Sequence, residues 1–353
     1  MKKFFFMTAA ATVLFAACQK TEVVYNEGPQ EIALTAVSNL ATKTPVDGVA
    51  FEEGDNMSVA AYLVSGATQA GDFFNKTEFV YSAGTTWHGD PARYWPITSS
   101  TINFLAVTEK GGGVDHTTVS FKDTKDYASS ATVVLANNNV SDQNDVMFAA
   151  GTQSHDEGDP YKVVPMVFKH ALAWVNFTVK TNTHNSKVTV NSITLNNAAY
   201  NGTLTLTNEQ YNSTTANVTN NVTATWDQPE LVNAMLVPNG KKGEQAAKAD
   251  AVELTSTSAA TAFGNGLLVI PNNGIDGFEK GAESFTINYT LTQEDGTKLT
   301  YDYTHKFAPV WEMAKKYTYN ITINLTEILI KPTVTDWVDE PGVNVPLDGY
   351  TRL

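Results

Sequence analysis

The stretch Tyr317-Thr-Tyr-Asn-Ile-Thr-Ile-Asn-Leu325 alternates large apolar side chains with Thr and Asn, without a break. Successive side chains of an extended strand point to opposite faces of a sheet, so the apolar residues of this stretch share one face. The polar face is typical of a sheet that packs on one side and contacts solvent on the other. The stretch therefore predicts a half-buried β-strand and, with it, a core built from sheets.

The same period of two recurs elsewhere in the second half of the chain. It is found at Val188–Val190, Leu204–Leu206, Phe285–Leu291 and Ala173–Lys180, the last with Val175, Phe177 and Val179 facing inward. Helical periodicity is limited to Gly243–Leu254, which could equally be a solvated loop. The pattern predicts an all-β chain made of two antiparallel β-sandwich domains in tandem, with little helix.

Short turn signals separate the predicted strands. Asp295-Gly296 lies between two apolar runs, and Asn201-Gly202 precedes Leu204. Both pairs are typical of hairpin turns, because Gly adopts positive φ at low cost. We therefore expect a hairpin at each pair.

The predicted organisation has three parts: a signal peptide over residues 1–17, an N-terminal sandwich over 18–158 and a C-terminal sandwich over 159–353. The boundary is placed in the polar segment Gly151–Pro160, whose composition is typical of a loop between domains. Its acidic residues Asp156, Glu157 and Asp159 lack the spacing of a calcium-binding loop. No metal site is predicted.

The N-terminus has the features of a secretory signal. Lys2 and Lys3 precede the apolar stretch Phe4–Ala17, which is too short for a membrane-spanning helix. The sequence before Cys18, the only cysteine of the chain, resembles a bacterial lipobox. The resemblance implies cleavage before Cys18, acylation of its sulfur with diacylglycerol and palmitate, and an outer-membrane lipoprotein exposed at the cell surface. A lipidated Cys18 would leave no thiol for catalysis, metal binding or disulfides.

Composition and motifs exclude several function classes. The chain has 37 acidic and 23 basic residues, a formal net charge of −14, which disfavours nucleic-acid binding. Its six histidines are scattered, and it contains neither a Gly-x-Ser-x-Gly sequence nor a phosphate-binding Gly-rich loop. The sequence predicts no enzyme and no cofactor. His170, between Phe168 and Leu172, is interpreted as a structural histidine.

The aromatic residues allow two interpretations. Tyr94, Trp95, Phe104 and Trp174 are expected to anchor the cores of the sandwiches. Alternatively, Trp87 or Trp95 could form an exposed platform for sugars, which would make the protein a surface glycan-binding lipoprotein. We keep that second function as the alternative.

Four segments taken together resemble the fimbrillin (Mfa-like) lipoproteins, which form type V pili on Gram-negative anaerobes. They are Ile32–Val37 with Ala41–Thr44 and Phe51–Val59; Tyr94-Trp-Pro96 with Ile102–Val107; Asp145-Val-Met147 with Val167–Ala173; and Trp311 with Tyr317–Ile323 and Val334–Trp337. Their order and span are similar to the family pattern over nearly the whole mature chain. The resemblance implies two transthyretin-like sandwich domains and a pilus subunit that contributes to adhesion.

The resemblance also implies polymerisation by donor-strand exchange. Ile32, Leu34 and Ala36 would form a detachable strand, and a surface protease would cut after Lys43, where many family members have Arg. The groove left by the strand would accept the C-terminal tail of another pilin subunit by β-augmentation. In this chain the tail residues are Val343, Val345 and Leu347.

After this processing the protein would be part of a fimbrium, with a host protein or a glycan as receptor. Pro341 precedes the apolar residues of the tail, and Pro346 lies between Val345 and Leu347. Both limit its main-chain pairing, because proline has no N–H.

Overall fold

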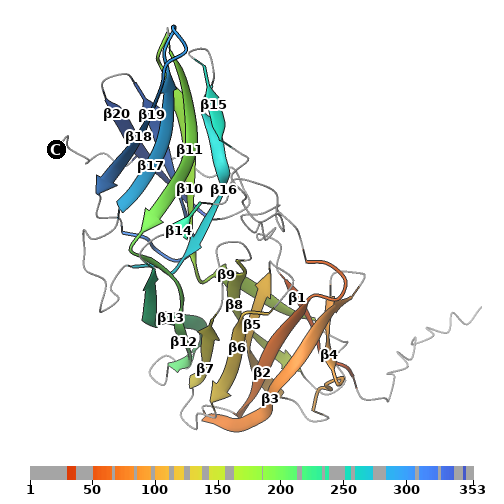
Figure 1. Ribbon diagram of the computed structural model, residues 1–353. Helices are drawn as coiled ribbons and strands as arrows, with labels where there is room; N and C mark the ends of the chain where they lie inside the picture. The colour runs from red at the N-terminus through yellow and green to blue at the C-terminus, as the bar shows by residue number, and fades with distance from the viewer. Residues whose placement is uncertain are drawn as a thin grey trace, which may run out of the picture.

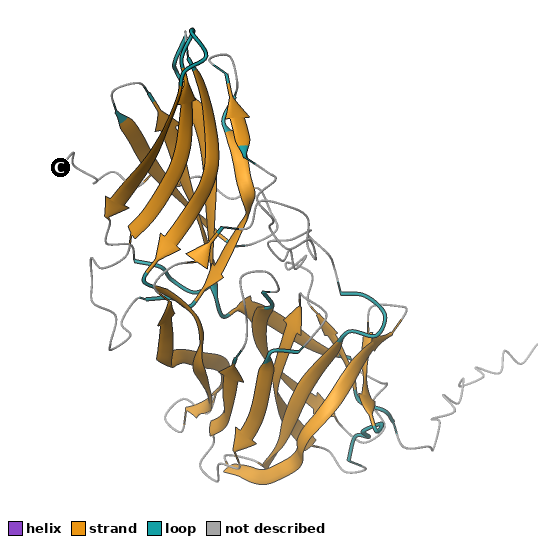
Figure 2. Ribbon diagram, in the orientation of Figure 1, coloured by secondary structure: helices purple, strands orange, loops and turns teal. Residues whose placement is uncertain are grey.

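The structure is a computed structural model. It describes residues 30–36, 51–65, 68–82, 86–96, 100–110, 115–122, 128–136, 143–155, 163–184, 186–212, 217–232, 235–237, 251–255, 259–272, 284–306, 310–324, 327–337 and 345–346. Every regular element within these ranges is a strand (Figure 2). No helix capable of crossing a membrane occurs in these ranges. The prediction of an all-β chain is confirmed. Of the segment considered for a helix, Val252–Leu254 is strand β15.

The first half of the chain builds a closed barrel with the strand order β1-β4-β3-β2-β5-β8-β9 (Figure 1). Its strands are β1 Ala33–Ala36, β2 Asn56–Ser65, β3 Thr68–Ser82, β4 Thr86–Asp90, β5 Ser100–Lys110, β8 Asp145–His155 and β9 Val164–His170. One buried apolar cluster, which includes Phe79, Trp87 and Phe104, fills the interior. The barrel is closed where β1 pairs with β4 on one side and with β9 on the other.

A four-stranded sheet packs on the outside of this barrel. Its order is β13-β12-β7-β6, with β6 Thr117–Lys122, β7 Ala128–Leu135, β12 Ala198–Asn212 and β13 Asn217–Val232. Leu204 and Leu206 of this sheet share one buried cluster with Leu105 and Phe148 of the barrel wall. Strand β5 is therefore buried on both faces, and every residue from Ile102 to Val107 is buried, with Asn103 the one polar residue among them.

The C-terminal part is a sandwich of two sheets (Figure 1). One has the order β16-β10-β19-β20-β21, with β10 Ala173–Thr181, β16 Thr261–Val269, β19 Lys315–Ile323, β20 Ile328–Asp336 and β21 Val345–Pro346. The other has the order β14-β11-β17-β18, with β11 Lys187–Asn196, β14 Met235–Leu236, β17 Ser284–Thr292, β18 Lys298–Lys306 and β15 also paired to β11. Tyr317, Tyr319, Ile321 and Ile323 lie in the core between them, as the alternation predicts.

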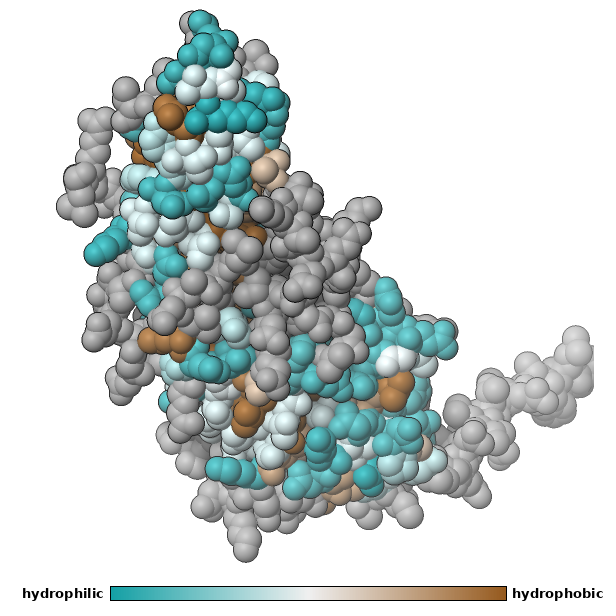
Figure 3. All heavy atoms as spheres, in the orientation of Figure 1, coloured by the Kyte–Doolittle hydropathy of each residue, from teal (hydrophilic) through white to brown (hydrophobic). Residues whose placement is uncertain are grey.

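The polar faces of these strands lie on the outside. On the face of the molecule shown in Figure 3, the surface of the sandwich is largely hydrophilic or neutral, with small apolar spots. Thr and Asn side chains bond one another across β17 and β18, for example Thr286 to Thr304 at 3.0 Å and Asn288 to Asp302 at 2.7 Å. These cross-strand bonds contribute a few tenths of a kcal/mol to about 1 kcal/mol each.

One of the two predicted hairpin turns is confirmed. β17 and β18 pair as far as Thr292 and Lys298, and the turn between them has Gly296 at a φ of 84°. The prediction of a turn at Asn201-Gly202 is wrong. Both residues lie inside β12, where its register with β13 is irregular. A Cβ on Gly202 would come within 2.7 Å of the Ile270 side chain, so this glycine serves close packing.

Three pairings bear on the division of the chain into domains. β9 follows residue 158 yet completes the barrel by pairing with β8 and β1. Further along the chain, β12 pairs with β7. The boundary at 158/159 stays a prediction, and strands from both sides of it are interleaved in the barrel and the sheet that packs on it.

Candidate functional site

The strand that closes the barrel, β1, is the candidate site. It is four residues long. It runs antiparallel to β4, with Leu34 opposite Trp87, and parallel to β9, with Leu34 opposite Val164 and Ala36 opposite Met166. Just before it, the Ile32 N–H donates to the Arg93 carbonyl at 2.7 Å. We call the space that β1 fills between β4 and β9 the β1 slot.

Two side chains anchor β1 to the interior of the barrel. Ile32 and Leu34 are 0% exposed, and both belong to the cluster that fills the barrel. Full burial of such a side chain stabilises by about 1.5–3 kcal/mol, so the pair contributes roughly 3–6 kcal/mol. The structure places these two predicted residues side by side in the barrel core. Ala36 lies in β1 opposite Met166.

Aromatic rings surround the β1 slot. Phe51 meets Trp87 edge-on, with ring centroids 4.8 Å apart, and lies 5.7 Å from Phe168 of β9. Tyr81 packs edge-on to Trp87 at 5.1 Å. Such contacts add about 0.5–1.5 kcal/mol per pair to the area that they bury. Without β1, these rings would face an apolar groove.

The polar contacts of β1 are weaker than its apolar ones. Glu31 Oε1 lies 3.1 Å from His88 Nδ1, and both side chains are more than a third exposed. An exposed pair of this kind contributes at most about 1 kcal/mol. Pro165, opposite Thr35 on β9, has no N–H to donate to the ladder. The short strand is therefore held mainly by side-chain burial.

The other predicted site residues lie elsewhere. Cys18, Lys43, Val343 and Leu347 are outside the described residues. Val345 lies in β21, opposite Val334 of β20. In this chain the structure thus places Val345 on the C-terminal sandwich and not in the β1 slot.

The sugar platform suggested for two tryptophans is wrong. Trp87 is 0% and Trp95 5% exposed, and both lie inside the barrel core. Tyr94, expected in a core, is 46% exposed, because only its neighbour Trp95 faces inward. Trp87 and β9, which form the walls of the β1 slot, were not predicted to be part of it. For β9, the alternation of Val164, Met166 and Phe168 indicates a strand with one buried face.

A second cluster joins residues of the resemblance motifs that are distant in the sequence. His170 is buried, as predicted for a structural histidine, and its Nδ1 lies 2.6 Å from Asp145 Oδ2. The His170 ring stacks on Trp337, with centroids 3.7 Å apart and planes 5° from parallel. Burial raises the pKa of the Asp145 carboxyl above its ordinary value, and the nearby imidazole opposes that rise.

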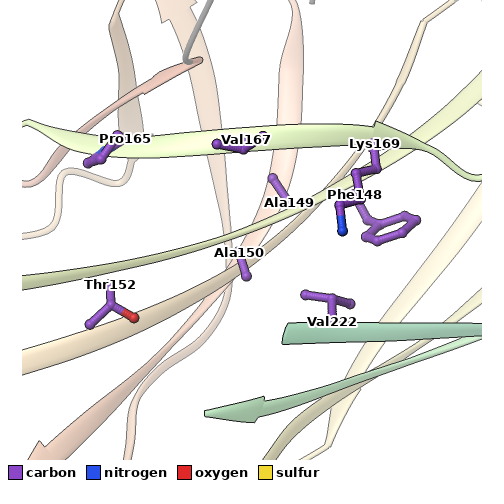
Figure 4. A pocket seen from close by; sticks show the side chains of 8 residues that line it. All are labelled: Phe148, Ala149, Ala150, Thr152, Pro165, Val167, Lys169 and Val222. Carbon is purple, nitrogen blue, oxygen red and sulfur yellow. The ribbon is translucent and has the colours of Figure 1, made fainter. Parts of the chain in front are cut away.

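A surface pocket and an acidic segment are the other candidates for a site. A pocket of about 350 Å³ lies on the outer face of the barrel between β8, β9 and β13 (Figure 4). Its lining is mainly apolar, with Thr152 and Lys169 as the polar residues. Within the described ranges, no group of three His, Cys, Asp or Glu side chains could hold a metal ion. The acidic segment at 156–159 lies outside those ranges.

Comparisons with known proteins identify relatives of this fold. The profile of the family described as fimbrillin-like matches residues 42–337. No curated protein matches the chain. Among solved structures, a fimbrial protein from Bacteroides vulgatus is 18% identical with a TM-score of 0.60, and the match covers 87% of this chain and 99% of that one.

Two other solved structures match less closely in shape. A proposed cell adhesion protein from Bacteroides uniformis is 17% identical, with a TM-score of 0.41, covering 87% of this chain and 98% of that one. The fimbrial anchor protein Mfa2 from Porphyromonas gingivalis is 10% identical, with a TM-score of 0.35, covering 90% and 99%. At identities of 18% or less, a structural match shows similarity of the fold alone. Of these three structures, only the Bacteroides vulgatus protein is similar enough in shape to support that conclusion.

Proposed function

The chain belongs to the fimbrillin-like family, and from that premise we propose that it is a pilus subunit that polymerises by donor-strand exchange. Membership of a fimbrial family supports a place at the cell surface, association with other pilin subunits and a structural rather than an enzymatic role.

The observation that carries the proposal is that β1, a strand of only four residues, is held by two fully buried side chains, Leu34 within it and Ile32 directly before it. A short strand held by two apolar anchors can be replaced by any strand that offers similar side chains at the same spacing. A longer donor would add main-chain pairing along β4 and β9, and β-augmentation of this kind uses such pairing for affinity. The β1 slot therefore has the geometry of an acceptor groove.

The order of the segments along the chain links anchoring to assembly. Cys18 precedes β1, and Lys43 follows it, so one cut after Lys43 would separate the rest of the subunit from both the lipid and the closing strand. We propose that a surface protease makes this cut on an outer-membrane lipoprotein. The C-terminal tail of a neighbouring subunit then fills the β1 slot with Val343, Val345 and Leu347, which alternate with the required period of two.

The test is a truncation that removes Val343–Leu353 from the full chain. We expect a folded protein that no longer forms SDS-resistant ladders after limited trypsin digestion, whereas the full-length chain forms them. Circular dichroism and gel electrophoresis provide the two measurements. Ladders of normal length from the truncated chain would show that the donor is another segment.

The rival function, binding of a surface glycan, is favoured by one observation. Tyr289 and Tyr301 stack with centroids 5.4 Å apart on the β17–β18 pair, and Tyr301 is 42% exposed. Exposed aromatic rings of this kind can stack on sugars. Titration of the protein with polysaccharides, followed by tyrosine and tryptophan fluorescence, tests this function. Saturable binding that Tyr301→Ala abolishes would support it.

A further inference from the structure

The cluster of Asp145, His170 and Trp337, which we call the junction clamp, joins three distant parts of the chain. Asp145 begins β8, His170 ends β9, and Trp337 directly follows β20. All three side chains are at most 3% exposed. The clamp lies in the buried cluster region shared by the barrel wall, the four-stranded sheet and the first strands of the sandwich.

The clamp buries polar groups where apolar side chains could pack. A buried histidine–carboxylate pair is often no more stabilising than apolar side chains of similar volume, so its presence points to a geometric role. Asp145 Oδ1 and Trp337 Nε1 are both buried without a hydrogen-bond partner. An isolated histidine–carboxylate pair stacked on a flat indole fixes the orientation of three groups at once, which an apolar cluster would not do.

Main-chain bonds continue the connection that the clamp begins. The Trp337 N–H donates to the Ala314 carbonyl at 2.8 Å, and the Ala314 N–H donates to the Leu172 carbonyl at 3.1 Å. Leu172 comes two residues after His170, the end of β9. On its other side, Trp337 lies 5.6 Å from Trp174, whose ring carries the Lys316 ammonium at 3.8 Å. The last residue before the tail is thus fixed to the end of β9.

One strand, β9, connects the β1 slot with the clamp. β9 pairs with β1 at Leu34–Ala36 and ends in the clamp at His170. The tail begins directly after Trp337. We propose that the junction clamp fixes the start of the C-terminal tail relative to the β1 slot of the same subunit. In a filament, this fixed relation would set how each subunit is positioned relative to the next. This inference rests on the proposed function, because the clamp matters to a filament only if the tail is the donor.

The first experiment tests the clamp without assembly. Hydrogen–deuterium exchange of the full chain is compared for wild type, Trp337→Leu and His170→Gln. We expect exchange of the amides at positions 337 and 314 to rise at least tenfold in both variants, while β5 keeps its wild-type protection. His184→Gln, at an exposed histidine, is the matched control and should change neither site. Wild-type protection of the amide at position 337 in both clamp variants would overturn the inference.

The second experiment measures the consequence for a filament. Wild type, Trp337→Leu and Phe285→Leu are digested to start assembly, and the persistence length of the filaments is measured in electron micrographs. Phe285 is fully buried in the sandwich core and controls for a general loss of stability. We expect a persistence length at least three-fold shorter for Trp337→Leu and unchanged for Phe285→Leu.

The outcomes of the two experiments are distinguishable. Straight filaments from Trp337→Leu would overturn the role of the clamp while leaving donor-strand exchange intact. If wild type forms no filaments at all, the proposed function fails, and the exchange experiment alone still decides whether the clamp holds Trp337.

Discussion

At the residue scale, the least expected group is a fully buried carboxylate. Asp145 is 0% exposed, and its one hydrogen-bond partner in the described part of the chain is His170. Such a pair is costly to break from one side, because the remaining group is left buried and unpaired. It is much less costly to replace as a whole. The pair is therefore suited to a double-mutant cycle.

We expect Asp145→Leu and His170→Leu each to lower the free energy of unfolding by about 3–5 kcal/mol. The double variant should lose far less than the sum, since it leaves no unpaired polar group. Urea denaturation at pH 7 provides the four values of the cycle. Strict additivity would mean that the two side chains do not interact.

A second prediction at this scale concerns pH. Burial lowers the pKa of the His305 imidazole below its ordinary value of 6.5, so the unfolded chain binds a proton more readily than the folded one. The stability associated with neutral His305 is present above pH 6.5 and is lost as the pH falls below that value. We expect the urea midpoint to fall less between pH 7.5 and pH 5.5 in His305→Gln than in wild type. His184→Gln, at an exposed site, should retain the wild-type pH dependence.

At the scale of the element, β1 is both the shortest strand of the barrel and the one that closes it. The strands beside it, β4 and β9, have five and seven residues. The segment contributes two side chains to the barrel core, Leu34 from β1 and Ile32 from the position directly before it. Its stability is thus concentrated in Ile32 and Leu34. The proposed exchange would replace this short segment and leave the other strands of the barrel in place.

Leu34→Ala should destabilise the docking of β1 by about 2–5 kcal/mol, the usual range for a fully buried leucine. We expect ladders to form faster after trypsin digestion, because the severed strand leaves its slot sooner. Leu329→Ala, the same substitution at a side chain that is 37% exposed, is the control. Equal rates for the two variants would mean that release of β1 does not limit assembly.

At the scale of the whole molecule, the proposed donor and acceptor segments belong to different parts of one chain. Val345 pairs with β20 of the sandwich, whereas Leu34 closes the barrel. Two variants therefore separate the functions. Lys43→Gln would keep its own β1 and could only donate, and a chain without Val343–Leu353 could only accept.

Mixed after digestion, these two variants should give SDS-resistant dimers and no longer species, while neither variant alone should give any oligomer. Gel electrophoresis with one partner fluorescently labelled identifies the dimer. Long ladders from the mixture would contradict a single donor and a single acceptor per subunit. Dimers from Lys43→Gln alone would place the cut elsewhere.

Much of the fold follows from local pattern. The alternation at Tyr317–Ile323 and Phe285–Leu291 predicts the strands of the sandwich, and Asp295-Gly296 predicts its hairpin, because strand faces and turn geometry depend on neighbouring residues alone. Ile32 and Leu34, which the family resemblance assigns to a detachable strand, are buried in the barrel core, and their detachment stays a prediction. The Asn201-Gly202 pair failed, because packing against Ile270 overrode its turn preference.

What the tertiary structure decided is which strands meet. The parallel pairing of β1 with β9 joins segments more than a hundred residues apart, and it turns an expected sandwich into a closed barrel. The burial of Trp87 and the meeting of Asp145, His170 and Trp337 depend on the same long-range register. The local alternation of side chains does not indicate which distant strands pair with each other. The sequence by itself determined the faces of the strands, and the closure of the barrel determined which faces became a slot and a clamp.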